Sequence, residues 1–267
     1  MKYSKQRIWI NMSNYEETFE ARGSLYNQAM RLAPQAREPE RAKLLDLLGA
    51  QPGEVVVDAP AGGGYVAEKL RELVGSTGRV ICVEPSAKFA EAIGGEFETY
   101  NVSMAATGME SACADRLASL AGLHHFDDNK PVFQEWARLL KPGGTCAVAD
   151  VLAGSRTDHF LNEFVHEGTP GGHCGYFFTI GDLRNLLEGA GFVNVREEVG
   201  DVSWEFNNRK EMVAFVHLLF GLSNYDEAEV AQGLETFLNI KDLAGDRVRM
   251  GWELLYATGK LPNEVGV

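Results

Sequence analysis

The strongest chemical signal in the sequence is a glycine-rich stretch, DAPAGGG, at residues 58–64. It follows the apolar run VVV and precedes a segment with helical spacing that starts near Tyr65. Glycine lets a ligand approach the backbone closely, and ligands of open α/β sheets bind where parallel strands end. We therefore interpret this stretch as a binding loop. The alternative is a tight turn that serves only the fold.

An acidic residue, Glu84, ends the next apolar run, RVICVE, 26 residues after Asp58. An ionised carboxylate only accepts hydrogen bonds, so it can bind both ribose hydroxyls of a nucleoside. The loop and Glu84 together predict a ligand that contains a nucleoside. Glu84 alone would equally suit a solvated strand end.

Histidines form a second group of candidate residues. His124 and His125 follow the apolar run LASLAGL, and His166 and His173 lie in the segment FVHEGTPGGHCGYF. Near neutral pH a histidine can take a proton from a reacting group. His124, His166 and His173 are therefore candidates for a general base. His125 and Tyr176 are candidates for substrate contacts; the alternative is a His-His pair that only orders its loop.

A metal site is a weaker interpretation of the same region. His159, Glu163 and His166 are spaced i, i+4 and i+7 and would share one face of a helix. This spacing matches no known closed metal site. We therefore predict a solvated helix followed by a substrate loop, and no metal.

Alternating strands and helices must position these residues. Strand-like runs are VVVD, RVICVEP, a weak FETYNVSM, RLASLAGLHHF and GTCAVADVL, and helical spacing marks REPERAKLLDLL, the segment after Tyr65 and PVFQEWARLL. This alternation predicts a parallel, doubly wound sheet. Beyond residue 206, the runs RKEMVAFVHLLFGL, AEVAQGLETFLNI and RMGWELLYATGK all carry apolar residues at helical spacing.

Composition limits the kinds of partner. A formal net charge of -13 over 267 residues argues against a nucleic-acid-binding face and favours a neutral or cationic small substrate. We see no apolar stretch that is long enough for a membrane span or a signal peptide. The four cysteines form no C-x-x-C pair, as expected of reduced residues in a cytoplasmic protein.

Several of these motifs together resemble one enzyme family. Asp58, Gly62 and Gly64 resemble the D-x-G-x-G-x-G signature of class I S-adenosylmethionine-dependent methyltransferases, and Glu84 matches the ribose-binding acid of that family. LASLAGLHHF, FQEWARLLKPGG and GYFFTIGDLRNLLEGAGFVNVREE resemble its later motifs, the last being the helix and antiparallel strands that close the sheet. The pattern is most similar to the small-molecule branch that includes ubiquinone and menaquinone biosynthesis enzymes.

The resemblance implies a fold and an activity. The fold is Rossmann-like α/β, with a doubly wound, mostly parallel seven-stranded sheet and helices on both faces. Residues 1–39 would form an N-terminal helical cover, 40–205 the cofactor-binding core and 206–267 a C-terminal helical extension. The activity is methyl transfer from S-adenosylmethionine to an oxygen, nitrogen or carbon of a small metabolite, with S-adenosylhomocysteine as product. A homodimer is compatible with the apolar C-terminal segments.

The resemblance also assigns site residues. Cofactor contacts fall on Asp58, Ala59, Pro60, Ala61, Gly62, Gly64, Glu84, Pro85, Ser103, Met104 and Ser119. In similar enzymes the N-terminal segment, here with Tyr26, folds over cofactor and acceptor and excludes water.

Two residues depart from the family pattern. Pro60 replaces the first glycine of the loop, and Ser103 stands where the family often has an acid. They motivate one alternative, a non-catalytic or repurposed protein that binds the cofactor. A dinucleotide dehydrogenase is a further alternative, because Gly62, Gly64 and Ala67 fit a relaxed G-x-G-x-x-A pattern.

Overall fold

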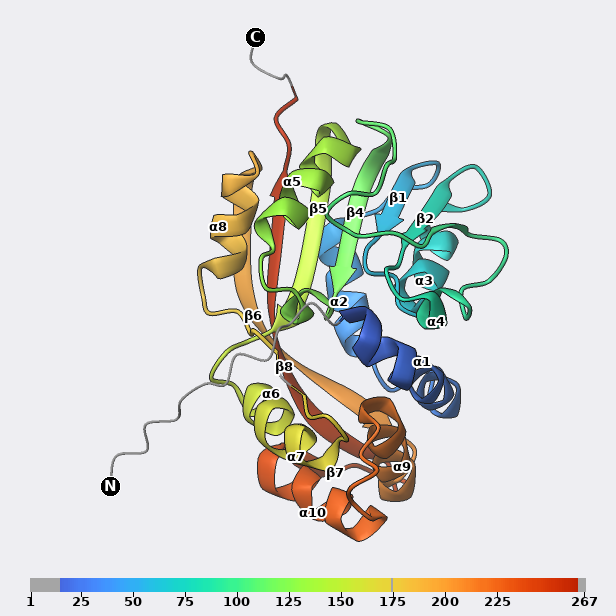
Figure 1. Cartoon of the computed structure of the whole chain (residues 1–267), viewed down its shortest axis with the longest axis vertical. Helices are drawn as coiled ribbons and strands as arrows, with labels where there is room; N and C mark the ends of the chain where they lie inside the picture. The colour runs from blue at the N-terminus through green and yellow to red at the C-terminus, as the bar shows by residue number, and fades with distance from the viewer. Residues whose placement is uncertain (1–14, 174, 264–267) are drawn as a thin grey trace.

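The computed structural model describes residues 15–173 and 175–263, and Figure 1 shows their arrangement. Predictions for residues 1–14, Cys174 and residues 264–267 lie outside this range. The strands are β1 (Val55–Asp58), β2 (Arg79–Val83), β3 (Glu98–Tyr100), β4 (Ala114–Leu120), β5 (Leu140–Val151), β6 (Val193–Phe206), β7 (Ile240–Asp242) and β8 (Val248–Lys260). The longer helices are α1 (Tyr15–Leu32), α2 (Glu38–Leu48), α3 (Tyr65–Val74), α5 (Lys130–Leu139), α8 (Asp182–Gly189), α9 (Arg209–Phe220) and α10 (Glu227–Phe237).

Short helical turns lie at the carboxyl ends of several strands. They are α4 (Ala87–Ala90), the 3-10 turn η1 (Leu123–His125), α6 (Arg156–His159), the π-helical turn η2 (Phe160–Val165) and α7 (His166–Gly168). Within the described residues, no helix is both long and apolar enough to cross a membrane.

One sheet runs through the molecule in the order β3-β2-β1-β4-β5-β8-β6, and β7 pairs with β8. Neighbouring strands from β3 to β5 are parallel, whereas β8 is antiparallel to both β5 and β6. The predicted doubly wound, mostly parallel sheet with reversed order of the last strands is therefore confirmed. It has eight strands where seven were expected.

The prediction that residues 206–267 form a helical extension is wrong for residues 248–260. This segment is β8, an interior strand of the sheet. Met250, Trp252, Leu254 and Tyr256 are buried in the core on one side, and Leu255 is buried in the core on the other. Residues 248–254 alternate apolar with polar or glycine positions, a strand pattern that the helical interpretation overlooked, whereas residues 254–257 are buried on both faces and have no such alternation.

Apolar cores lie on both faces of the sheet. One face packs against α2 and α3, whose side chains include Leu44, Leu48 and Leu70. The other packs against α5 and α8, through residues such as Trp136 and Leu187. Burying the sheet between two helical layers fixes where its strands end, and hence where a ligand can bind.

Strands β6 and β8 continue past the carboxyl ends of the parallel strands and carry a second lobe. This lobe contains α6, η2, α7, α9 and α10 (Figure 1). Its aromatic core includes Phe160, whose ring lies 5.8 Å from that of Phe220 and 6.3 Å from that of Trp252. Helix α1 packs against both α4 and α9, so it bridges the parallel sheet and the lobe.

Candidate active site

The glycine-rich loop lies at the carboxyl end of β1, in the middle of the parallel sheet. Its Ala61 N–H donates to the Val83 carbonyl at 3.0 Å, which ties the loop to β2. Gly62 and Gly64 have φ of +55° and +91°, a region that side chains rarely adopt. A methyl group added at Gly62 would meet no atom within 4 Å. The loop therefore leaves open space beside Gly62.

Glu84 holds the other side of this loop. Its buried carboxylate accepts the Gly62 N–H at 2.7 Å on Oε2 and the Ser86 N–H at 2.8 Å on Oε1. The side chain of Asn101, after β3, donates to the carbonyls of Glu84 and Pro85 at 2.8 and 2.9 Å. Each carboxylate oxygen has two lone pairs, so Glu84 can accept further donors from a ligand.

Two buried polar groups next to the loop lack partners. Neither carboxyl oxygen of Asp58 nor the hydroxyl of Ser119 makes a well-formed hydrogen bond with a described residue. Burial raises the pKa of Asp58 well above its ordinary value; the nearby N–H of Ala67 lowers it and the charge of Glu84 raises it further. Buried polar groups are almost always paired, so these atoms mark a place where a bound ligand or water supplies donors.

A histidine and an aspartate pair at the carboxyl ends of β4 and β5. His124 Nδ1 lies 2.7 Å from Asp150 Oδ1, and both side chains are buried. Asp150 also accepts the backbone N–H groups of Leu123 and Val151, at 2.9 and 2.7 Å. An ionised aspartate only accepts, so the proton of this bond belongs to His124 Nδ1, and the neutral form of the ring has its lone pair on Nε2.

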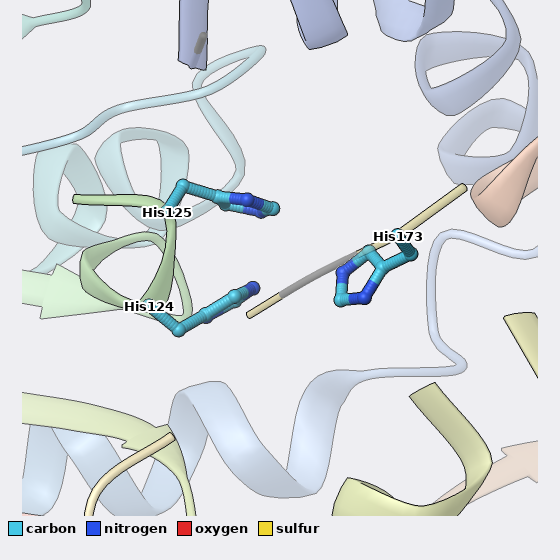
Figure 2. Close-up of side chains that lie close together, drawn as sticks. All are labelled: His124, His125 and His173. Atoms are coloured by element: carbon cyan, nitrogen blue, oxygen red, sulfur yellow. The ribbon is translucent and has the colours of Figure 1, made fainter. Parts of the chain in front are cut away.

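His125 and His173 lie against His124. Figure 2 shows the three rings facing a common space, with centroid distances of 4.1 Å for His124–His125, 6.0 Å for His124–His173 and 5.6 Å for His125–His173. Burial lowers the pKa values of His125 and His173 well below the ordinary value, and nearby His124 and Arg22 lower both further. Both imidazoles are therefore neutral near pH 7.

The loop that carries His173 is fastened from two sides. His166 Nδ1 donates to the His173 carbonyl at 2.7 Å, and Arg22 of α1 donates to the Gly172 carbonyl at 2.7 Å. Gly172 has a φ of +78°, and a side chain there would meet the ring of His166 at 2.7 Å. We call residues 169–173 the cover loop, because α1 and His166 hold them over the histidines.

Comparison with known proteins shows which family resembles the part of the chain that forms this site. Residues 57–148, which contain the glycine loop, Glu84 and His124, match the family described as methyltransferase domain. No curated protein matches the sequence.

Solved structures share the fold of this chain at low sequence identity. A chain of the Haloferax volcanii complex of the Trm112 methyltransferase activator with a methyltransferase has a TM-score of 0.62 and 16% identity, over 94% of this chain and 99% of that one. A Thermotoga maritima S-adenosylmethionine-dependent methyltransferase, described as a possible histamine N-methyltransferase, has a TM-score of 0.59 and 18% sequence identity. The match covers 93% of this chain and 99% of that one. A third structure is Haemonchus contortus phosphoethanolamine N-methyltransferase 2 in complex with phosphomonomethylethanolamine and S-adenosylhomocysteine. It has a TM-score of 0.61 and 15% sequence identity, and the match covers 92% of this chain and 60% of that one.

The match of residues 57–148 and the shared fold support an S-adenosylmethionine-dependent methyltransferase. The loop fits this ligand in three respects: open space at Gly62, a carboxylate at Glu84 with capacity for hydroxyl donors, and an unpaired buried carboxyl at Asp58. The cofactor carries ribose hydroxyls, an ammonium group and a sulfonium, which complement these acids. Which of these residues contact the cofactor stays a prediction.

The other predicted cofactor residues have varied surroundings. The Ala59–Pro60 peptide is cis, and the Pro60 ring packs closely on Gly122, where an added Cβ would lie 2.2 Å from its Cγ. Met104 is fully buried. Ser103 is exposed, and its hydroxyl accepts the Ala105 N–H at 3.3 Å. The Ser103 hydroxyl thus takes part in a local turn.

The side chains of two predicted substrate residues contact other groups than the three histidines. The ring of Tyr26 packs edge-on against Phe89 of α4 at 5.0 Å, and its hydroxyl accepts from Arg37. Tyr176 is 56% exposed and lines a separate groove of about 510 Å³ that also includes Asp127 and Asp182. A substrate role for Tyr26 or Tyr176 stays a prediction.

The metal alternative considered on the helix face does not assemble. His159 and Glu163 form an exposed pair at 2.9 Å, while His166 is engaged by the cover loop. Among the described residues, the group of possible metal ligands is instead His124, His125 and His173.

Sequence reasoning missed Asp150, Arg22 and Asn101. An acid at the end of the apolar run GTCAVAD was a usable signal for Asp150, because strand ends meet at the ligand edge of a parallel sheet. The roles of Arg22 and Asn101 follow from contacts with residues distant in the sequence.

Proposed function

We propose that this methyltransferase transfers a methyl group to an oxygen, nitrogen or carbon atom of a small metabolite that binds beside His124. The observation that carries the proposal is the buried His124–Asp150 pair at the carboxyl ends of β4 and β5, next to the cofactor loop after β1. The same edge of the sheet thus offers a nucleoside site and a fixed imidazole.

A small acceptor suits the way this site is enclosed. His124 and His173 are only 5% and 7% exposed, and Arg22 of α1 donates to the cover loop, which carries His173. A protein or nucleic-acid acceptor would need an open surface, whereas small ligands bury most of their own surface. The formal charge of -13 favours a neutral or cationic metabolite over a phosphate polymer.

The cofactor supplies an electrophilic methyl group on a sulfonium. The acceptor atom forms a bond to the methyl carbon while the carbon–sulfur bond breaks. The electron pair of the broken bond stays on sulfur, which becomes a neutral thioether. Catalysis of such a displacement depends mainly on alignment and on the exclusion of water. Here α1 and the cover loop exclude water.

His124 provides the proton acceptor where the acceptor atom carries a proton. Its Nε2 lone pair takes that proton, and the carboxylate of Asp150 stabilises the resulting imidazolium and keeps the ring oriented. His166 is used to hold the cover loop, and we assign it a positioning role. The similarity to quinone-biosynthesis enzymes stays a prediction about the acceptor.

Calorimetric titration with S-adenosylmethionine and S-adenosylhomocysteine, followed by turnover on a panel of amines, phenols and carboxylates, tests the proposal. We expect cofactor binding by the full chain and turnover that falls in His124→Ala. His159→Ala is the matched control, because His159 also contacts a carboxylate but is exposed. Tight cofactor binding without turnover on any acceptor would instead support a repurposed protein.

A further inference from the structure

We propose that His124, His125 and His173 bind one divalent transition metal ion of the Zn²⁺ type, placed to contact the methyl acceptor. The role in catalysis rests on the proposed function, whereas the binding of the ion rests only on these three side chains. The sequence alone predicted no metal.

The first observation is geometric. One nitrogen from each ring lies within 4.8 Å of the corresponding nitrogens of the other two. Zn–N bonds of about 2.0–2.1 Å in a tetrahedral site place ligand nitrogens about 3.3–3.4 Å apart. Small rotations of the side chains would close this difference, and Figure 2 shows the rings already directed toward a common space.

The second observation is the partner of His124. A metal-binding histidine almost always donates its other ring N–H to a carboxylate or a carbonyl, which fixes the tautomer and makes the ring more basic. His124 does this with buried Asp150 at 2.7 Å, so Nε2 is the nitrogen left for an ion. Two backbone N–H groups hold the Asp150 carboxylate in turn.

The third observation is an unpaired atom. His173 is 7% exposed, and its Nδ1 has no hydrogen-bond partner among the described residues. Leaving a buried polar nitrogen unpaired is costly, so a second ligand in this pocket is expected.

The local charges set the kind of ion. Arg22 is the nearby cation, and its guanidinium is directed to the Gly172 carbonyl at 2.7 Å; Asp150 contributes the opposing negative charge. Three neutral imidazoles suit Zn²⁺ and related ions better than Mg²⁺ or Ca²⁺, which prefer oxygen ligands.

Three protein ligands also leave an open position, as catalytic zinc sites do. An acceptor atom bound there would lose its proton to water more readily, because the ion lowers the pKa of its ligands. A lone pair on His124 Nε2 cannot bind an ion and accept a proton at once. The metal-bound protein therefore uses the ion, and not His124, to ionise the acceptor.

The test uses the full chain, stripped with a chelator and titrated with Zn²⁺ alone against a chromogenic competitor, with and without S-adenosylhomocysteine. We expect one Zn²⁺ per chain, and an affinity that falls at least tenfold in His125→Ala, His173→Ala and Asp150→Asn, since even outer partners cost about 10- to 100-fold. His159→Ala should bind as the wild type does. Circular dichroism melts identify any variant that fails to fold, and His173→Gln then replaces it.

Two results would overturn the metal site: no stoichiometric Zn²⁺ binding, or binding that His125→Ala, His173→Ala and Asp150→Asn all leave unchanged. Retained cofactor binding and turnover in the stripped wild type would then leave the proposed function standing. Conversely, Zn²⁺ bound through these histidines in a chain that binds no S-adenosylhomocysteine would support the site and contradict the proposed function.

Discussion

Replacing Asp150 by asparagine tests the core of the proposed chemistry. Asp150 Oδ1 accepts from His124 Nδ1 and from the Val151 N–H, and Oδ2 accepts from the Leu123 N–H. Asparagine has one acceptor oxygen and no charge, so one of these positions would meet an N–H₂ donor, and the charge-assisted bond to His124 would be lost in either orientation of the amide. Losing a charge-assisted hydrogen bond costs about 1.5–3 kcal/mol, which corresponds to about a 10- to 150-fold lower kcat.

The assay is steady-state methyl transfer, with cofactor affinity measured separately by calorimetry. We expect kcat to fall while the Kd for S-adenosylmethionine stays within about twofold, because Asp150 contacts η1 and β5 and not the cofactor loop. An unchanged kcat would refute the assignment. A parallel loss of cofactor affinity and melting temperature would show that Asp150 only supports the fold.

Four further predictions concern the cofactor site and its cover. Glu84→Ala should weaken S-adenosylmethionine binding by about 1–3 kcal/mol in calorimetry, because the ribose hydroxyls and the Gly62 N–H lose an acceptor. Gly62→Ala should weaken cofactor binding. Gly49→Ala is its control, because Gly49 has a similar φ of +63° and also borders open space: it should lower the free energy of unfolding by about 1–2 kcal/mol without altering the Kd for S-adenosylmethionine. Arg22→Ala should lower kcat or raise the acceptor KM at unchanged cofactor Kd, since the cover loop loses its link to α1. Because the pKa of Asp58 is raised in the folded chain, this carboxyl keeps a proton that the unfolded chain releases above about pH 3.8. Its contribution to the free energy of unfolding therefore falls as pH rises. Asp58→Asn should raise the melting temperature of the cofactor-free protein more at pH 8 than at pH 4.

The glycine-rich loop was predictable because the residues that shape it lie close together in the sequence. The strand, the glycines and the acid of the next strand fall within one stretch of the chain, and the structure brings Gly62 and Glu84 together at 2.7 Å. The β8 strand was predictable in part, because residues 248–254 alternate buried with more exposed positions, which is the period of a strand, and only residues 254–257 are buried on both faces.

The acceptor side depends on contacts between distant segments. The sequence does not state that β5 lies beside β4, which is what brings Asp150 to His124, 26 residues away. Tyr176 was a plausible substrate residue, and its backbone N–H does bond the His124 carbonyl at 2.8 Å. Yet its ring lines the outer groove, while the ring of the next residue, Phe177, lies 5.3 Å from that of His124.

The placement of β8 has a consequence for how the protein is made. Residues 248–260 are synthesised after β5 and β6, yet they fill the position between these two strands. Until they arrive, a nascent chain exposes the hydrogen-bonding edge of β5, and the lobe that completes the histidine pocket lacks its central support. A chain that terminates before residue 248 is therefore expected to aggregate and to be degraded, because its sheet lacks the strand that joins β5 to β6.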